Sequence, residues 1–192
     1  MRLARRTALG VLGAALMPVH AQARKLTIAA ASDLRFALDE AMRAFRAVHA
    51  DARIEVVYGS SGKLATQIRH GAPFDVFLSA DREFADALHR DGFAAGAPRL
   101  YARGHLVAWS TDASLGRLPL ADLVRDARVQ RFAIANPEHA PYGRRAVEAL
   151  RSQGQWDAVQ PKLVLGENIA QAVQFVQTGA AQAGLVALSL SL

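Results

Sequence analysis

The chain of 192 residues is long enough for one or two small domains, each with a hydrophobic core. It contains no cysteine, so we expect neither a disulfide framework nor a cysteine-linked lipid anchor. Its formal net charge is +6, but the basic residues form no run of five or more and few aromatic residues lie among them, which argues against nucleic-acid binding.

The N-terminal segment predicts a secretory signal peptide over residues 1–23. Three arginines lie among the first six residues, an apolar run follows over residues 7–17, and Ala21-Gln22-Ala23 offers a cleavage site. A membrane anchor is the less favoured alternative, because this run is shorter than the roughly 20 residues that a transmembrane helix needs. The segment carries three of the 23 basic residues and none of the 17 acidic ones, so its removal lowers the net charge to +3. We therefore expect a secreted protein whose mature form is soluble.

The first expected elements of the mature chain are an apolar strand over residues 25–30 and a helix from Leu34 to Val48. In the helical segment, apolar residues recur at spacings of three and four, with charged residues on the other side. Ser32 and Asp33 lie at the junction of strand and helix. Either residue could simply be a helix N-cap.

A second strand-to-helix junction lies within residues 53–68, RIEVVYGSSGKLATQI. The alternation of residues 54–58 predicts a strand, and the helix begins after Gly59-Ser60-Ser61-Gly62. Unpaired N–H groups and the positive end of a helix dipole could bind an anion there, and an ordinary serine N-cap remains equally open. The phosphate-loop pattern G-x-x-x-x-G-K-[ST] fails, because Val57 replaces its first glycine and Leu64 follows the lysine. The nucleophile pattern G-x-S-x-G is not met either.

The remaining chain continues to alternate between strands and helices, which predicts βαβ units and mainly parallel sheets. An extended segment over residues 100–110 suits a crossover between two lobes. Pro137 and Pro141 stiffen the loop of residues 136–143, so that backbone N–H groups from Tyr142 onward could face a ligand. Strands are expected at 74–79, 130–135, 162–166 and 184–189, and helices at 81–91, 118–125, 144–153 and 169–177.

Four of the expected strand ends are followed by a turn that opens a helix. These turns lie near Ser32, Ser61, Tyr142 and Ile169. Ligands of open parallel sheets bind outside the carboxyl ends of the strands. The four turns are therefore candidates for one shared anion site.

Six segments, in this order, resemble the periplasmic molybdate-binding proteins of ABC transporters, and together they cover essentially the whole mature chain. They are AAASDL (29–34), GSSGKLATQI (59–68), GAPFDVFLSAD (71–81), NPEHAPYG (136–143), GEN (166–168) and GLVALS (184–189). The resemblance implies an α/β, two-lobed periplasmic-binding-protein fold of type II with mainly parallel sheets and an interlobe cleft. It places lobe I at residues 24–103 and lobe II, with the start of the crossover back, at residues 104–192. The family continues beyond the GLVALS strand, so we expect the C-terminal return segment of lobe I to be missing after residue 192.

The resemblance also implies the residues that bind the ligand. Ser32 and Ser61 correspond to the ligands of the first lobe, and Asp33 and Ser60 adjoin them through their backbone. Tyr142 and Ile169 correspond to the ligands of the second lobe, largely through backbone N–H groups. Some members of the family have a tyrosine where this chain has Ala187, and we expect Tyr142 to take its place here.

The function implied by the resemblance is capture of molybdate or tungstate and its delivery to a membrane ABC permease. We expect a monomer that is not an enzyme, needs no cofactor, and binds metal only as the oxyanion. A receptor for sulfate or another small anion is the first alternative. A secreted serine hydrolase is the second, with Ser60 or Ser61 as nucleophile and His139 as the only histidine near enough to act as base. No histidine pair has the spacing of a zinc site.

Overall fold

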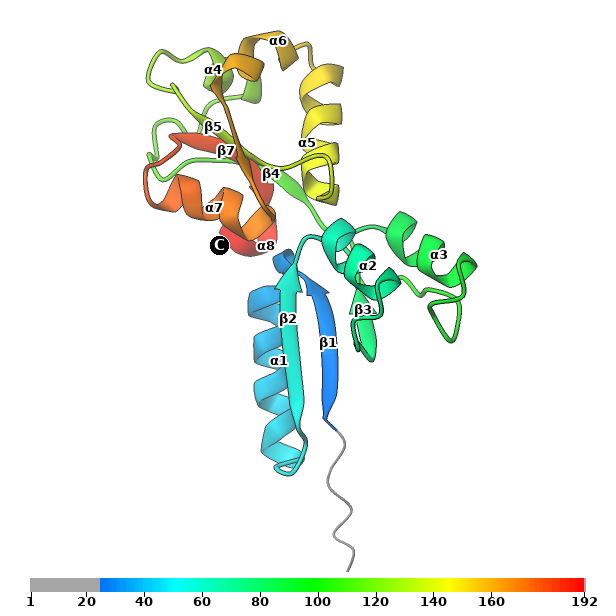
Figure 1. Cartoon of the computed structure of the whole chain (residues 1–192). Helices are drawn as coiled ribbons and strands as arrows, with labels where there is room; N and C mark the ends of the chain where they lie inside the picture. Colours follow the sequence, from blue (N-terminus) through cyan, green and yellow to red (C-terminus); the bar gives the residue numbers. More distant parts are fainter. Residues whose placement is uncertain (1–24, 192) are drawn as a thin grey trace, which may run out of the picture.

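The computed structural model describes residues 25–191, which form two α/β lobes (Figure 1). Lobe I contains a three-stranded parallel sheet in the order β2-β1-β3. Its strands are β1 (Leu26–Ala31), β2 (Ile54–Gly59) and β3 (Val76–Leu78). Its helices are η1 (Ser32–Leu34), α1 (Arg35–Val48), α2 (Ser61–Arg69) and α3 (Arg82–Arg90). The predicted signal peptide lies outside the described residues.

Lobe II contains a four-stranded sheet in the order β4-β7-β5-β6, in which only the β4–β7 pair is antiparallel. Its strands are β4 (Leu106–Trp109), β5 (Phe132–Ala135), β6 (Leu163–Gly166) and β7 (Ala183–Ala187). Its helices are α4 (Leu120–Arg125), α5 (Pro141–Ser152), α6 (Trp156–Val159), η2 (Gln160–Lys162), α7 (Ile169–Gln177) and α8 (Leu188–Ser191). The predicted α/β class with mainly parallel sheets is confirmed.

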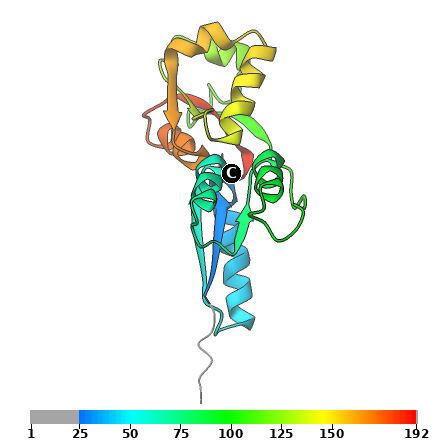
Figure 2. The ribbon, with the colours of Figure 1, turned by 45° about the vertical axis from the view of Figure 1, so that its right-hand side comes forward.

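The hydrophobic core is concentrated in lobe II. Every residue of β5 is inaccessible to solvent, because β5 lies between β6 and β7 and is covered by α5 and α7. In lobe I the best-buried strand is β1, whereas α1 has no buried residue and leaves Phe36 and Val48 exposed. In both views the carboxyl ends of β1 and β2 point toward lobe II (Figures 1 and 2). The residues that follow these strands are therefore brought to the junction of the lobes.

Several elements begin or end elsewhere than the sequence predicts. Helix α5 begins at Pro141 rather than at residue 144, because proline lacks the N–H group that a first helical residue leaves unpaired. The extended segment 100–110 contains only the short strand β4. A Cβ on Gly104 would overlap the hydroxyl of Tyr142, so this part of the crossover lies against lobe II. Strand β7 ends at Ala187 and is followed directly by α8.

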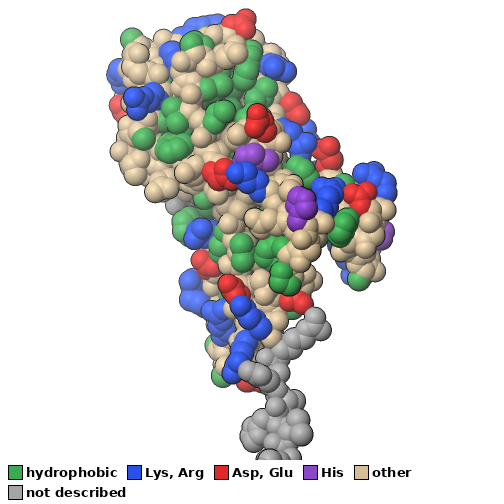
Figure 3. Space-filling model, in the orientation of Figure 1, with side chains coloured by type: hydrophobic (Ala, Val, Ile, Leu, Met, Phe, Trp, Pro, Cys, Tyr) green, Lys and Arg blue, Asp and Glu red, His purple; other side chains and the backbone are tan. Residues whose placement is uncertain are grey.

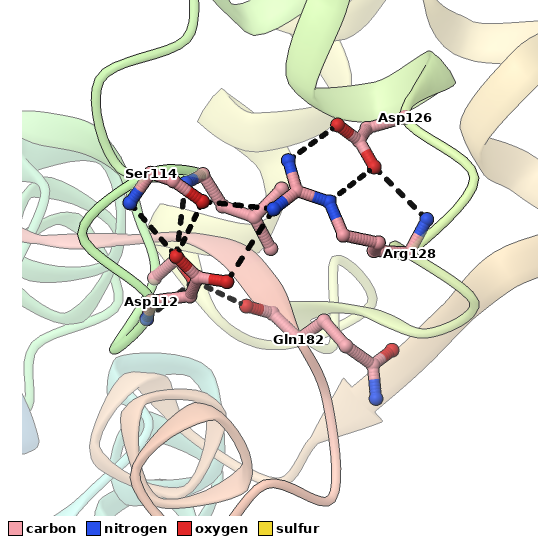
Figure 4. Close-up of polar contacts among 7 residues, drawn as sticks. Asp112, Ser114, Asp126, Arg128 and Gln182 are labelled. Carbon is pink, nitrogen blue, oxygen red and sulfur yellow. Dashed lines mark hydrogen bonds and ion pairs between the residues drawn. The ribbon is translucent and has the colours of Figure 1, made fainter.

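A polar cluster around Arg128 holds the loop before α4 against the end of that helix in lobe II (Figure 4). Its guanidinium donates to Asp126 Oδ2 at 2.7 Å and to Ser114 Oγ at 2.8 Å, and Asp112 Oδ2 lies 3.6 Å from it. The hydrogen bond from Arg128 is the main reason why the pKa of Asp126 is lowered to about 2. The cluster thus stabilises the loop of lobe II and is separate from the cavity described below.

No helix within residues 25–191 is both long enough and apolar enough to span a lipid bilayer.

Candidate functional site

A small cavity lies between the two lobes, and all six predicted site residues line it. They are Ser32, Asp33, Ser60, Ser61, Tyr142 and Ile169. The rest of the wall is made of small residues and one proline: Ala31, Gly59, Ala80, Ala140 and Pro141. The space that these atoms leave free is about 190 Å³, part of it open to solvent. A cavity of this size suits a small ion.

Four helices begin at this cavity: η1 at Ser32, α2 at Ser61, α5 at Pro141 and α7 at Ile169. The first N–H groups of a helix have no acceptor within the helix, and they form the positive end of its dipole. Two of these beginnings belong to lobe I and two to lobe II. The cavity therefore receives N–H donors from both lobes and favours an anion.

The serine side chains around the cavity do not cap their own helices. Ser60 occupies the N-cap position of α2 without a capping hydrogen bond, and its Oγ lies 2.9 Å from His139 Nδ1 instead. Ser61 Oγ accepts from the backbone N–H of Ala80 at 3.0 Å. The alternative that these serines are ordinary N-caps is therefore wrong.

The hydroxyl protons of two serines remain available for a ligand. Ser32 Oγ accepts from the N–H of Ala170 at 3.4 Å, across the junction of the lobes, just as Ser61 Oγ accepts from Ala80. A hydroxyl that accepts a hydrogen bond still has one proton to donate. Both side chains can thus add neutral donors to those of the helix beginnings.

Among the residues that the structure describes, Asp33 has the only charged side chain that lines the cavity, and no lysine or arginine of this part of the chain does so. Its side chain is well buried, with the residue 9% exposed. Oδ2 accepts from the Tyr142 hydroxyl at 3.2 Å, while Oδ1 has no hydrogen-bond partner among the described residues. Burial raises the pKa of Asp33 more than the hydrogen bond from Tyr142 lowers it. Burial and the neighbouring Asp33 also raise the pKa of Tyr142, which stays a neutral donor.

Asp33→Asn should stabilise the ligand-free protein at neutral pH. A carboxyl whose pKa is raised on folding is harder to ionise in the folded state, so stability is lost as the pH rises through the folded-state pKa. Asparagine can still accept from Tyr142 and carries no charge. In urea unfolding between about pH 3 and about pH 8, the two proteins should have similar stability at the acid end, below the ordinary pKa of aspartate, and diverge as the pH rises. A constant difference across this range would contradict the prediction.

His139 contacts lobe I in two ways, of which the sequence suggested only the contact of its ring with a serine. Besides the contact between its ring and Ser60, its carbonyl oxygen accepts from the N–H of Gly62 at 2.9 Å. Its Nε2 lies 3.9 Å from Glu167 Oε2. The ring of His139 thus lies between Ser60 and Glu167, but the distance to Glu167 is too long for a hydrogen bond, and Ser60 is buried. The geometry does not support the hydrolase alternative.

The sequence analysis missed two features of the site: the part that Ala80 plays in the cavity wall and the contact between Gly62 and His139. Ala80 follows the carboxyl end of β3, so the rule that ligands bind beyond strand ends could have identified it. The contacts of Gly62 and His139 give no local sequence signal, since they depend on how the lobes meet. Within the described part of the chain, no three His, Cys, Asp or Glu side chains form a cluster that could hold a metal ion.

Two α/β lobes joined by a crossover, with an ion-sized cavity between them, define a solute-binding protein of two-lobed architecture. Residues 26–192 match the family of bacterial extracellular solute-binding proteins, and the chain belongs to this family.

Relatives within this class include two proteins named molybdate-binding protein ModA. The chain is 38% identical to the one from Azotobacter vinelandii over 179 residues, which cover 93% of this chain and 70% of that protein. It is 41% identical to the one from Rhodobacter capsulatus over 137 residues, which cover 71% of this chain and 54% of that protein. The matched part of the chain therefore spans 54% and 70% of the length of these two relatives.

The structure is similar to that of the periplasmic molybdate-binding protein of Azotobacter vinelandii, with a TM-score of 0.77 at 31% identity. The match covers 85% of this chain and 71% of that one. The sulfate-binding protein SubI of Mycobacterium tuberculosis has the same fold, with a TM-score of 0.64 at 13% identity. The predicted two-lobed periplasmic-binding-protein fold and the resemblance to molybdate-binding proteins are thus confirmed.

Proposed function

We propose that the protein captures molybdate or tungstate in the periplasm and delivers it to a membrane ABC permease. The observation that carries this proposal is the cavity itself, where helix beginnings of both lobes and serine hydroxyls of lobe I converge, with no lysine or arginine among the described residues that line it. The similarity to proteins named for molybdate binding supports the choice of ion. In this role the protein acts as a monomeric receptor without a cofactor and catalyses no reaction.

The ion is held by neutral donors. In our proposal the hydroxyls of Ser32 and Ser61 donate from lobe I, with the backbone of Asp33 and Ser60 adjoining, and the backbone N–H groups of Tyr142 and Ile169 donate from lobe II. A hydrogen bond to a charged group contributes about 1.5–3 kcal/mol. Oriented dipoles balance the charge of the ion without a counter-ion.

Selectivity follows from donors held at a fixed distance on two lobes. A smaller ion such as sulfate cannot reach both sets of donors, so some N–H groups stay unpaired in the closed protein. Loss of one such hydrogen bond, at about 1.5–3 kcal/mol, corresponds to roughly tenfold or more in affinity. Closure itself is a hinge motion that the bound ion stabilises by contacting both lobes.

Titration with four oxyanions tests this function. Molybdate, tungstate, sulfate and phosphate are added separately while the fluorescence of Trp109 and Trp156 and the heat of binding are recorded. We expect molybdate and tungstate to bind at least about tenfold more tightly than sulfate, because they satisfy donors on both lobes. A response to sulfate with none to molybdate would instead support the receptor for sulfate or another small anion.

A further inference from the structure

Arg144 joins the two lobes beside the cavity. Its Nη2 lies 2.5 Å from Asp81 Oδ2, its Nη1 lies 2.9 Å from Glu83 Oε2, and its guanidinium stacks 4.9 Å from the centroid of the Phe84 ring. Arg144 belongs to the first turn of α5 in lobe II, whereas its partners lie at the start of α3 in lobe I (Figure 1). One side chain thus makes three contacts across the junction.

The main partner of Arg144 is a carboxylate that is already fixed in place. Asp81 is the N-cap of α3, and its Oδ1 accepts from the N–H of Phe84 at 3.2 Å. Its side chain is 12% exposed and that of Arg144 is 32% exposed. An ion pair shielded from solvent and made by a pre-ordered group is stronger than an open surface pair. We therefore expect this contact to contribute to interlobe binding.

The same contact is connected to the cavity from both sides. Asp81 follows Ala80, whose N–H donates to Ser61 Oγ in the cavity wall. In lobe II, Tyr142 of the cavity wall lies two residues before Arg144. Yet Arg144 does not line the cavity, and its two Nη groups are engaged by carboxylates. It is placed to hold the walls together and not to neutralise the ion.

A second ion pair across the junction is more exposed. Lys63 Nζ of α2 lies 2.5 Å from Glu167 Oε1 of lobe II, and the two side chains are 50% and 46% exposed. Acidic, basic and histidine side chains gather on the surface where the lobes meet (Figure 3). Because exposed pairs contribute little, the Arg144 contact is the stronger of the two.

We propose that Arg144 fastens the lobes in the ion-loaded protein and thereby sets how long the ion remains bound. This inference rests on the proposed function, and it makes Arg144 a positioning residue that touches no ligand. The contact exists only while the lobes are together. Its loss therefore speeds opening and ion release, with little effect on the rate of capture.

The neighbouring Arg145 provides a matched control. It pairs with Glu148 of its own helix at 2.7 Å, and its side chain is 63% exposed. It also lies within the electrostatic field of Asp81 and Glu83 without a hydrogen bond to either. Replacing Arg145 removes the same charge from almost the same place but leaves the contacts between the lobes intact.

The test is stopped-flow fluorescence of molybdate binding and release in the wild type, Arg144→Gln, Arg144→Lys and Arg145→Gln. We expect Arg144→Gln to raise the dissociation rate constant about fivefold or more while the association rate constant changes less than about twofold. Arg144→Lys, which keeps the charge, should fall between this variant and the wild type. Arg145→Gln should release the ion within about twofold of the wild-type rate.

Asp81→Asn tests the same contact from lobe I if Arg144→Gln does not fold, because asparagine can still cap α3 but removes the buried charge that Arg144 pairs with. It should also accelerate release, and in combination with Arg144→Gln it should add less than the two single effects together. Equal release from Arg144→Gln and the wild type, or equal acceleration by Arg144→Gln and Arg145→Gln, would overturn the inference while leaving the proposed function standing. Absence of molybdate binding to the wild type would instead refute the proposed function, and the inference with it.

Discussion

Gly62→Ala should weaken molybdate binding by roughly five- to a hundred-and-fiftyfold, from the 1–3 kcal/mol that overpacking typically costs. A Cβ at this position would lie 2.6 Å from the carbonyl oxygen of His139 and 2.9 Å from Cζ of Phe84. The Phe84 ring belongs to the same lobe and can shift. The His139 carbonyl is backbone of lobe II, and it also accepts the N–H of Gly62. The added methyl group therefore opposes closure itself.

Isothermal titration calorimetry of Gly62→Ala with molybdate measures this effect, and Gly96→Ala is the matched control. Nothing lies within 4 Å of a Cβ at Gly96, so the same substitution there should leave the affinity unchanged. Without ligand, the two variants should unfold at similar temperatures, although their affinities for molybdate differ. The reason is that the clash arises between the lobes. Wild-type affinity in Gly62→Ala would show that the lobes bind the ion without meeting at His139.

The convergence of the site could be predicted because it depends on local patterns and one rule of sheet geometry. Ser32, Ser61, Tyr142 and Ile169 each lie at or next to the start of a helix that follows a strand. Carboxyl ends of parallel strands share one edge of a sheet, so such residues gather there. The register of neither sheet was needed for this step. Within each sheet the pattern of strand, polar turn and helix was sufficient, whereas the meeting of the two sets in one cleft was implied by the resemblance to two-lobed binding proteins.

The contacts between the lobes could not be predicted in this way. Gly62 and His139 are 77 positions apart, and Asp81 and Arg144 are 63 apart; their distances depend on how two separately formed lobes meet. Their local sequence is equally consistent with a solvated loop or a surface helix. The beginning of α5 was also misplaced, since Pro141 can either stiffen a loop or start a helix. The sequence reveals donors that follow strands, but not the partners that arise from tertiary packing.

Ser61→Ala should weaken molybdate binding more than tenfold, because it removes a donor worth about 1.5–3 kcal/mol to a charged ligand. The side chain is buried in the cavity wall, and its oxygen accepts from the N–H of Ala80, which leaves its proton for the ion. The same substitution leaves that N–H group unpaired, so stability should also fall by about 1–3 kcal/mol.

Ser79→Ala separates the loss of affinity from the loss of stability. Ser79 accepts from the N–H of Asp81 in the same loop but does not line the cavity. It should therefore lose some stability while binding molybdate normally in calorimetry, whereas unchanged affinity in Ser61→Ala would remove this hydroxyl from the proposed set of ligands.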